Sequence, residues 1–172
     1  MGIIGDNHKR KIRAYIIVTK TMTKEDLYGK EYSRDDFVFF WKNDSLYSFL
    51  SQWYAASFVI DGIRYNCAEQ YMLAQKAVMF GDSYILRKIM ASDNPVIMNQ
   101  FGRQVRNFNP DVWDVHCQYI VKKANIAKFS QNHFLNKSLP ATGDKIVVEA
   151  SPYDTIWCIG LEEDLLEACV PE

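Results

Sequence analysis

Two charged residues, Glu69 and Lys76, stand out in an otherwise apolar stretch that runs from Tyr65 to Gly81. The stretch has the apolar content of a buried helix. The seven-residue spacing puts both side chains on one side of that helix, about 10 Å apart along its axis. Because a carboxylate and an amine are costly to bury, we expect both to face one cleft. The alternative is that Glu69 forms a capping box with Asn66 and that Lys76 extends to water.

A carboxylic acid and an amine in one cleft are suited to cleaving the bond between a sugar and a base. Breaking this N-glycosidic bond develops positive charge on the anomeric carbon, which a carboxylate stabilises, and the leaving base must gain a proton. An amine with a lowered pKa can instead attack the anomeric carbon, or the aldehyde of the open sugar, and form an imine. The residue types alone leave both routes open.

Two further places combine polar and aromatic side chains beyond what a core requires. The first is Trp41 with segment 48–54, and the second is segment 149–157. Glu149 stands in an apolar, strand-like run, where it needs either a partner or a place on the solvent face of a sheet. Asp154 is equally typical of an Asx turn before a strand.

The composition favours a single globular domain without a metal or an organic cofactor. The chain has 172 residues, of which 48% are apolar, so it can bury a core of ordinary size. A net charge of −1 argues against a polybasic nucleic-acid binder or an electrostatic membrane anchor. The cysteines and histidines lack zinc-site spacing, and no glycine-rich phosphate loop is present. Without a signal peptide or a membrane-spanning apolar run, the sequence predicts a cytoplasmic protein.

The elements that must position these residues form a mainly helical α+β pattern. A hairpin is predicted over 58–65, with Asp61-Gly62 at its turn, and it leads into the helix of Glu69 and Lys76. Further helices are predicted from 82 or 83 to about 91, from 95 to about 106, from 111 to about 130 and from about 132 to 139. Strands are predicted over 37–41, 146–150 and 155–159.

Residues 1–35 form an N-terminal extension in this interpretation, either an extra edge strand or a mobile arm, and residues 36–172 form the domain. The extension contains a basic cluster and the β-branched run AYIIVT at 14–19, but no recognisable chemistry. The segment 128–132 is predicted to be structural, with Phe129 in the core and with Gln131 and Asn132 satisfying backbone groups near the helix end.

The residues, taken in this order, resemble the NADAR family, also called YbiA-like, which are small N-glycosidases named for their association with NAD and ADP-ribose. The similarity runs from about Phe37 to Leu161, and the order and spacing of its motifs are specific together. The matching landmarks are FLS at 49–51, the hairpin at 58–65, AEQY at 68–71, AQK at 74–76, Gly102-Arg103, Trp113, KFSQN at 128–132, TGD at 142–144, EAS at 149–151, Asp154, Trp157 and Gly160.

The resemblance implies a mainly helical, single α+β domain with a small antiparallel sheet or hairpin. It also implies hydrolysis of the N-glycosidic bond between a phosphorylated ribose and a nitrogenous base. Two substrate types are associated with the family: ribosylamino-pyrimidine intermediates of riboflavin synthesis, and ADP-ribose attached to guanine in nucleic acid. The expected partner is therefore a small ribosylated base or ADP-ribosylated guanine. No membrane partner is expected, and the oligomeric state is left open.

Carried over position by position, the resemblance implies catalytic roles for Glu69, Lys76 and Asp154, with Lys76 as the candidate imine former. It implies substrate-binding roles for five residues, of which Arg103 is placed to meet phosphate: Trp41, Ser51, Arg103, Glu149 and Trp157. It implies no metal ligands and no cofactor.

The chain departs from the family pattern at several places. Gln52 stands where Asn is usual, Cys158 stands where Gly is usual, and the closing helix is short and acidic. These departures motivate an alternative function of another class, a non-catalytic module that binds ADP-ribose or a related nucleotide.

Overall fold

The computed structural model of the chain describes residues 27, 29–41, 46–153, 158–161 and 164–169. The chain divides into two compact units, one of residues 52–136 and one of residues 1–51 together with 137–172. Most of the extension predicted for residues 1–35 lies outside the described residues. Within the described part of the chain, no helix is long and apolar enough to cross a membrane.

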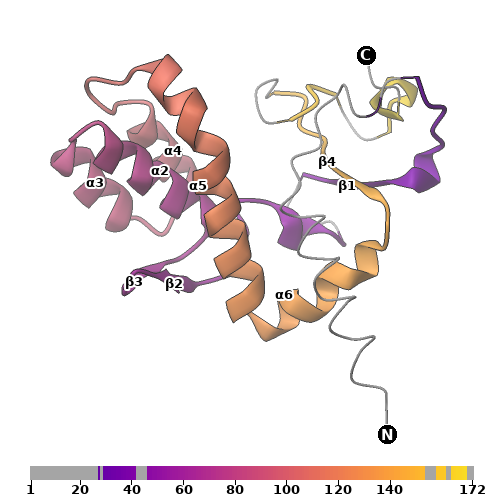
Figure 1. The fold of residues 1–172 in the computed structure, drawn as a ribbon, viewed down its shortest axis with the longest axis horizontal. Coiled ribbons are helices and arrows are strands. Elements are labelled where there is room, and N and C mark those ends of the chain that lie inside the picture. Colours follow the sequence, from indigo (N-terminus) through magenta and orange to yellow (C-terminus); the bar gives the residue numbers. More distant parts are fainter. Residues whose placement is uncertain (1–26, 28, 42–45, 154–157, 162–163, 170–172) are drawn as a thin grey trace, which may run out of the picture. The chain divides into compact units, whose positions relative to one another are not determined.

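The unit of residues 52–136 is organised around helix α2 (Ala68–Met79), which carries Glu69 and Lys76. Helix α2 packs against α3 (Ser83–Met90), α4 (Pro95–Gly102) and α5 (Pro110–Gln131), as Figure 1 shows. The core between these helices contains five fully buried apolar side chains, three of them alanines: Ala68, Ala77, Ile89, Met98 and Ala124. Small residues on α2 allow its neighbours to approach closely, so the helix is surrounded on several sides.

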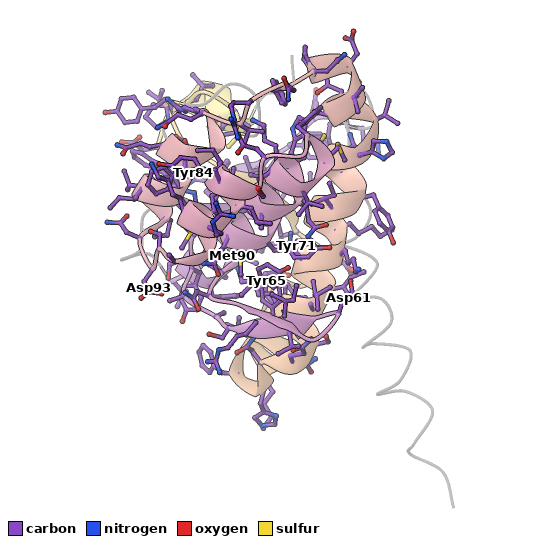
Figure 2. The ribbon with its side chains drawn as sticks, turned by 90° about the vertical axis from the view of Figure 1, so that its left-hand side faces the viewer. Asp61, Tyr65, Tyr71, Tyr84, Met90 and Asp93 are labelled. Atoms are coloured by element: carbon purple, nitrogen blue, oxygen red, sulfur yellow. The ribbon has the colours of Figure 1, made fainter. Side chains whose placement is uncertain are left out.

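The predicted hairpin is confirmed and is fastened to α2 by aromatic rings. Strands β2 (Phe58–Ile60) and β3 (Ile63–Tyr65) pair antiparallel, with Asp61 and Gly62 at positive φ in the turn. The rings of Tyr65 and Tyr71 meet edge-on with centroids 5.0 Å apart, and Figure 2 shows them side by side. Burial raises the pKa of both phenols, so they stay neutral and pack as aromatic groups. The hairpin therefore fixes the end of α2 from which Glu69 projects.

The start of α2 differs from the predicted capping box. Cys67 precedes the helix, and the backbone N–H of Asn66 donates to Oε1 of Gln70 at 2.8 Å. The side chain that reaches back to the residues before the helix is thus that of Gln70, one position after the Glu69 of the capping-box interpretation. The backbone N–H of Glu69 donates to the carbonyl of Gln52 at 3.0 Å. The capping interpretation of Glu69 is therefore wrong.

Helix α4 is shorter than the sequence predicts, because a buried carboxylate holds the chain that follows it. The predicted end is near residue 106, but the helix ends at Gly102. The backbone N–H and the guanidinium of Arg106 donate to Asp82 at 3.0 Å, and Asp82 also caps α3 by accepting from the N–H of Ile85. These donors hold the pKa of Asp82 well below its usual range. The pair ties loop 103–109 to the start of α3.

The second unit contains a two-stranded parallel sheet and several short helices. Strand β1 (Phe37–Phe40) pairs with β4 (Ile146–Glu149), so that Phe40 lies opposite Glu149. Phe37, Phe39, Ala150 and Ala168 form its core. The other described elements are α6 (His133–Ser138), which crosses the boundary of the two units, and the 3-10 helices η2 (Arg34–Asp36), η3 (Ser48–Leu50), η4 (Leu139–Thr142) and η5 (Leu166–Cys169). The strand predicted over 155–159 begins outside the described residues. The hairpin and helices nevertheless confirm the predicted α+β class.

The end of α5 has the structural role predicted for segment 128–132. Phe129 is 2% exposed. The side-chain amide of Gln131 donates to the carbonyl of Val59 and accepts from its N–H, both at 2.8 Å, so it pairs with an edge of the hairpin like another strand. Asn132 donates to the carbonyls of Ser57 and Lys128. These contacts join the end of α5 to the hairpin that positions α2.

We expect Phe129→Ala to lower the free energy of unfolding by about 3–5 kcal/mol, because the truncation leaves a cavity at a buried site. Chemical denaturation measures this loss directly. Phe134→Ala is the matched control, since that ring is 67% exposed and its loss should change stability little. A Phe129→Ala protein that unfolds at the wild-type denaturant concentration but no longer binds ligand would contradict the structural role.

Candidate active site

Glu69 lies in the first turn of α2, where it is held by a neighbouring helix. The residue is 4% exposed. Its Oε1 accepts a hydrogen bond of 3.1 Å from Nδ2 of Asn99 in α4. A carboxylate in such surroundings is held in a fixed orientation by a neutral donor. No pattern in the sequence points to Asn99, since its contact with Glu69 depends on how α4 packs on α2.

Lys76 lies two turns later on the same helix and is half-buried among aromatic rings. Its Nζ is 4.0 Å from the ring centroid of Phe108 and 5.8 Å from that of Trp113. Burial lowers the pKa of Lys76, the charge of Glu69 opposes this shift, and the charge of Arg103 adds to it. The amine is therefore neutral more often than an ordinary lysine, which is what a nucleophilic amine requires.

The charges of two other predicted site residues, Glu69 and Arg103, both act on the pKa of Lys76, so each lies within electrostatic reach of its amine. Arg103 directly follows α4 and is exposed. Gly102 before it is buried against α2, and a Cβ there would overlap the side chain of Leu73. The missing side chain allows the end of α4 to approach α2 closely. This close approach brings Arg103 toward Lys76.

The other sequence-predicted site residues belong to the unit that contains β1 and β4. Trp41 follows β1 and contacts Tyr153, with ring centroids 5.7 Å apart. Ser51 is buried at the end of η3, and Glu149 is half-buried at the end of β4. Asp154 and Trp157 lie outside the described residues. Their predicted roles remain predictions.

Comparison with known proteins places this arrangement in a family. A model of the NADAR domain matches residues 39–168, which include every predicted site residue. The chain belongs to the NADAR family. The fold described above is therefore that of a NADAR domain.

Three relatives illustrate the range of this NADAR protein's family. N-glycosidase R617 of Acanthamoeba polyphaga mimivirus is 46% identical over 135 residues, which cover 74% of this chain and 79% of that protein. Riboflavin biosynthesis protein VVA0006 of Vibrio vulnificus is 27% identical over 124 residues, covering 70% of this chain and 32% of that protein. The solved structure of Escherichia coli YbiA has a TM-score of 0.65 at 25% identity and covers 81% of each chain. The YbiA-like fold predicted from the sequence is confirmed.

Gln52, one of the departures from the family pattern, uses its longer side chain for hydrogen bonds in this NADAR protein. The side-chain amide of Gln52 pairs reciprocally with that of Asn125 in α5, through hydrogen bonds of 3.1 and 3.3 Å. The carbonyl of the same residue accepts from the N–H of Glu69. The longer side chain is therefore used to anchor the loop before the hairpin, and its backbone supports the first turn of α2.

Proposed function

We propose that this NADAR protein is an N-glycosidase that hydrolyses the bond between a phosphorylated ribose and a nitrogenous base. The observation that carries the proposal is the pairing of a half-buried amine, whose pKa is lowered, with a buried carboxyl group on the same face of α2. Relatives from mimivirus and from Escherichia coli are named N-glycosidases, which supports the reaction class.

The proposed reaction uses Lys76 as nucleophile and Glu69 first as acid and then as base. The reacting form has a neutral Lys76 amine and a protonated Glu69, which together hold as many protons as the ammonium ion and the carboxylate do. The lone pair of Nζ forms a bond to C1 of the ribose while the bond from C1 to the base nitrogen breaks, and the base leaves with the proton of Glu69. The ring C1–O bond then opens, the ring oxygen takes the Nζ proton, and an imine remains. Glu69 accepts a proton from water as the water adds to C1. Departure of the amine releases the sugar, so one water is consumed in each turnover.

Phosphate recognition is proposed for Arg103, since it is exposed and its charge already acts on Lys76. From the family resemblance we also propose Asp154 as a third catalytic residue. On the same basis we propose substrate-binding roles for the remaining predicted residues, Trp41, Ser51, Glu149 and Trp157.

Two substrates fit the proposal, a ribosylamino-pyrimidine phosphate and ADP-ribose attached to guanine in nucleic acid. The name of the Vibrio vulnificus relative supports the first, and the family resemblance supports both. We propose the cytoplasm as the compartment, because none of the four cysteines, Cys67, Cys117, Cys158 and Cys169, forms a disulfide, as is usual in a reducing environment.

Incubating the protein with each of these substrates in separate reactions tests the proposal. We expect release of the free base together with the free ribose phosphate or ADP-ribose from at least one of them. A binding measurement with ADP-ribose accompanies each reaction. Tight binding without release of base from either substrate would contradict the enzyme and would favour the non-catalytic nucleotide-binding module.

A further inference from the structure

The ring of Phe108 forms the contact nearest to the charged end of Lys76 among the described aromatic residues. The distance of 4.0 Å from Nζ to the ring centroid is well inside the range in which a cation is attracted to an aromatic face. Phe80, just after α2, meets the same ring edge-on with centroids 5.2 Å apart. The ring of Phe108 is therefore packed against Phe80 while one of its faces supports the amine.

The loop that carries Phe108 is itself held firmly in place. Three hydrogen bonds from Arg106 to the buried carboxylate of Asp82 anchor it two residues earlier. Asn107 then turns the chain at a φ of 57°, in the left-handed region that Asn tolerates better than most residues. On the other side, Asn109 caps α5 through bonds to the N–H groups of Asp111 and Val112. The position of the ring is thus set by both neighbours.

We propose that Phe108 is a positioning residue for Lys76: its ring favours the ammonium form of the amine in the ligand-free protein and so limits how much reactive neutral amine is present. The inference rests on the proposed role of Lys76 as the nucleophile. A ligand sugar must then draw the amine from the ring before the bond to C1 forms. Between turnovers, the contact with the ring holds the basic, aldehyde-reactive amine of Lys76 in place and protects it from reaction.

Other groups around Lys76 act on its protonation in known directions. Burial and the charge of Arg103, from the end of α4, favour the neutral amine, and Glu69 on the same helix favours the ammonium ion. From the start of α5 and the loop before it come the rings of Trp113 and Phe108. Because a ring face attracts the ammonium ion but not the neutral amine, Phe108 acts in the same direction as Glu69.

Competitive labelling of lysines with trace acetic anhydride tests the inference without any substrate, because only neutral amines react. The variant Phe108→Leu keeps an apolar side chain but removes the aromatic face, and Phe108→Tyr keeps the face. At pH 7 we expect Lys76 to be acetylated about two- to fivefold faster in Phe108→Leu than in the wild type, given the usual strength of a cation–π contact. In Phe108→Tyr the rate should equal that of the wild type.

Lys88 is the internal control, since its Nζ lies 4.7 and 5.0 Å from the ring centroids of Tyr84 and Phe101 and does not depend on Phe108. Its labelling rate should be the same in all variants, which also reports that the fold is intact. If Phe108→Leu alters the Lys88 rate, Phe108→Met replaces it with the same expectation. Phe108 is 40% exposed, so both substitutions are compatible with folding.

The pH dependence of the labelling rate distinguishes a change in the protonation of Lys76 from a change in how easily the reagent reaches it. Well above the pKa of lysine every amine is neutral, so the Lys76 rates of Phe108→Leu and wild type should converge. An equal rate at pH 7, or a ratio that is the same at every pH, would overturn the inference. In an active enzyme, the acidic limb of the pH–rate profile of Phe108→Leu should also move to lower pH. Altered labelling in a protein that releases no base would contradict the proposed function, while the effect of Phe108 on the protonation of Lys76 would still stand.

Discussion

Glu69→Gln should lower turnover by about a hundredfold or more, because the amide can neither protonate the leaving base nor accept a proton from water. The fold should be unaffected. The Oε1 atom of Gln can still accept the hydrogen bond from Asn99, and the helix start is satisfied by Gln70 rather than by Glu69. Steady-state kinetics on the substrate that releases base, together with a thermal melt, measure both expectations.

The matched control for this substitution is Asp111→Asn, which removes a carboxylate from the first turn of α5 at an exposed position. It should turn over substrate at close to the wild-type rate. Turnover of Glu69→Gln within a few-fold of the wild type would assign Glu69 a purely structural role and would remove the acid and base from the proposed reaction.

Lys76→Arg should reduce turnover by about a thousandfold or more, since a guanidinium stays protonated at any working pH and cannot form the bond to C1. The substitution keeps the positive charge near Glu69 and the possibility of contact with the Phe108 ring. The loss should therefore appear in the catalytic step rather than in stability. Single-turnover measurements at saturating substrate isolate that step.

Lys88→Arg is the control, because it replaces another lysine that lies over aromatic rings, on α3, and should leave turnover unchanged. Full activity of Lys76→Arg would rule out the imine and would leave Lys76 the role of holding phosphate or orienting Glu69.

The pH dependence of the wild type follows from the neutral amine that the reaction needs. Burial lowers the pKa of Lys76, so turnover should fall as the pH drops through that pKa, on the acidic side of the ordinary lysine range. A pH–rate profile in which the acidic limb disappears in Lys76→Arg assigns the limb to this residue. An unchanged limb in the residual activity would assign it to another group.

Local signals in the sequence were sufficient for the elements whose ends are determined by neighbouring residues. The Asp61-Gly62 turn, a start of α3 at residue 82 or 83 and a start of α5 near residue 111 were predicted; the structure has the turn, an Asp82 cap before α3 and an Asn109 cap before α5. Each depends on backbone geometry or on a side chain that bonds to the next turn, so no knowledge of the tertiary structure is needed.

The errors occur where a distant residue decides between equivalent local choices. Glu69 and Gln70 both stand at distances from Asn66 that allow a side chain to reach back, and the capping-box alternative assigned this contact to Glu69. In the structure Asn99 of α4 binds the Glu69 carboxylate, and Gln70 makes the capping bond. The end of α4 was predicted too late for a similar reason. The hydrogen bond from the backbone N–H of Arg106 to Asp82 holds the residues after Gly102 away from the helical path.

The residues of the candidate site also differ in whether a local sequence pattern points to them. The spacing on one helix predicted Glu69 and Lys76 as site residues, and the family resemblance added Arg103, whose charge acts on Lys76 in the structure. Phe108 was not identified, because its distance from Lys76 depends on how loop 103–109 is tied to α3. The available signal was its place directly before an Asn-Pro cap, where an apolar residue often packs against the helix that follows.

Trapping of the imine with borohydride tests the central claim, that Lys76 forms a bond to the sugar, most directly. Borohydride is added during turnover of the substrate that releases base, and the digested protein is analysed by mass spectrometry. The account predicts a reduced sugar adduct on the peptide that contains Lys76, absent without substrate and absent in Lys76→Arg. Continued release of base in the presence of borohydride, with no adduct on Lys76, would contradict it.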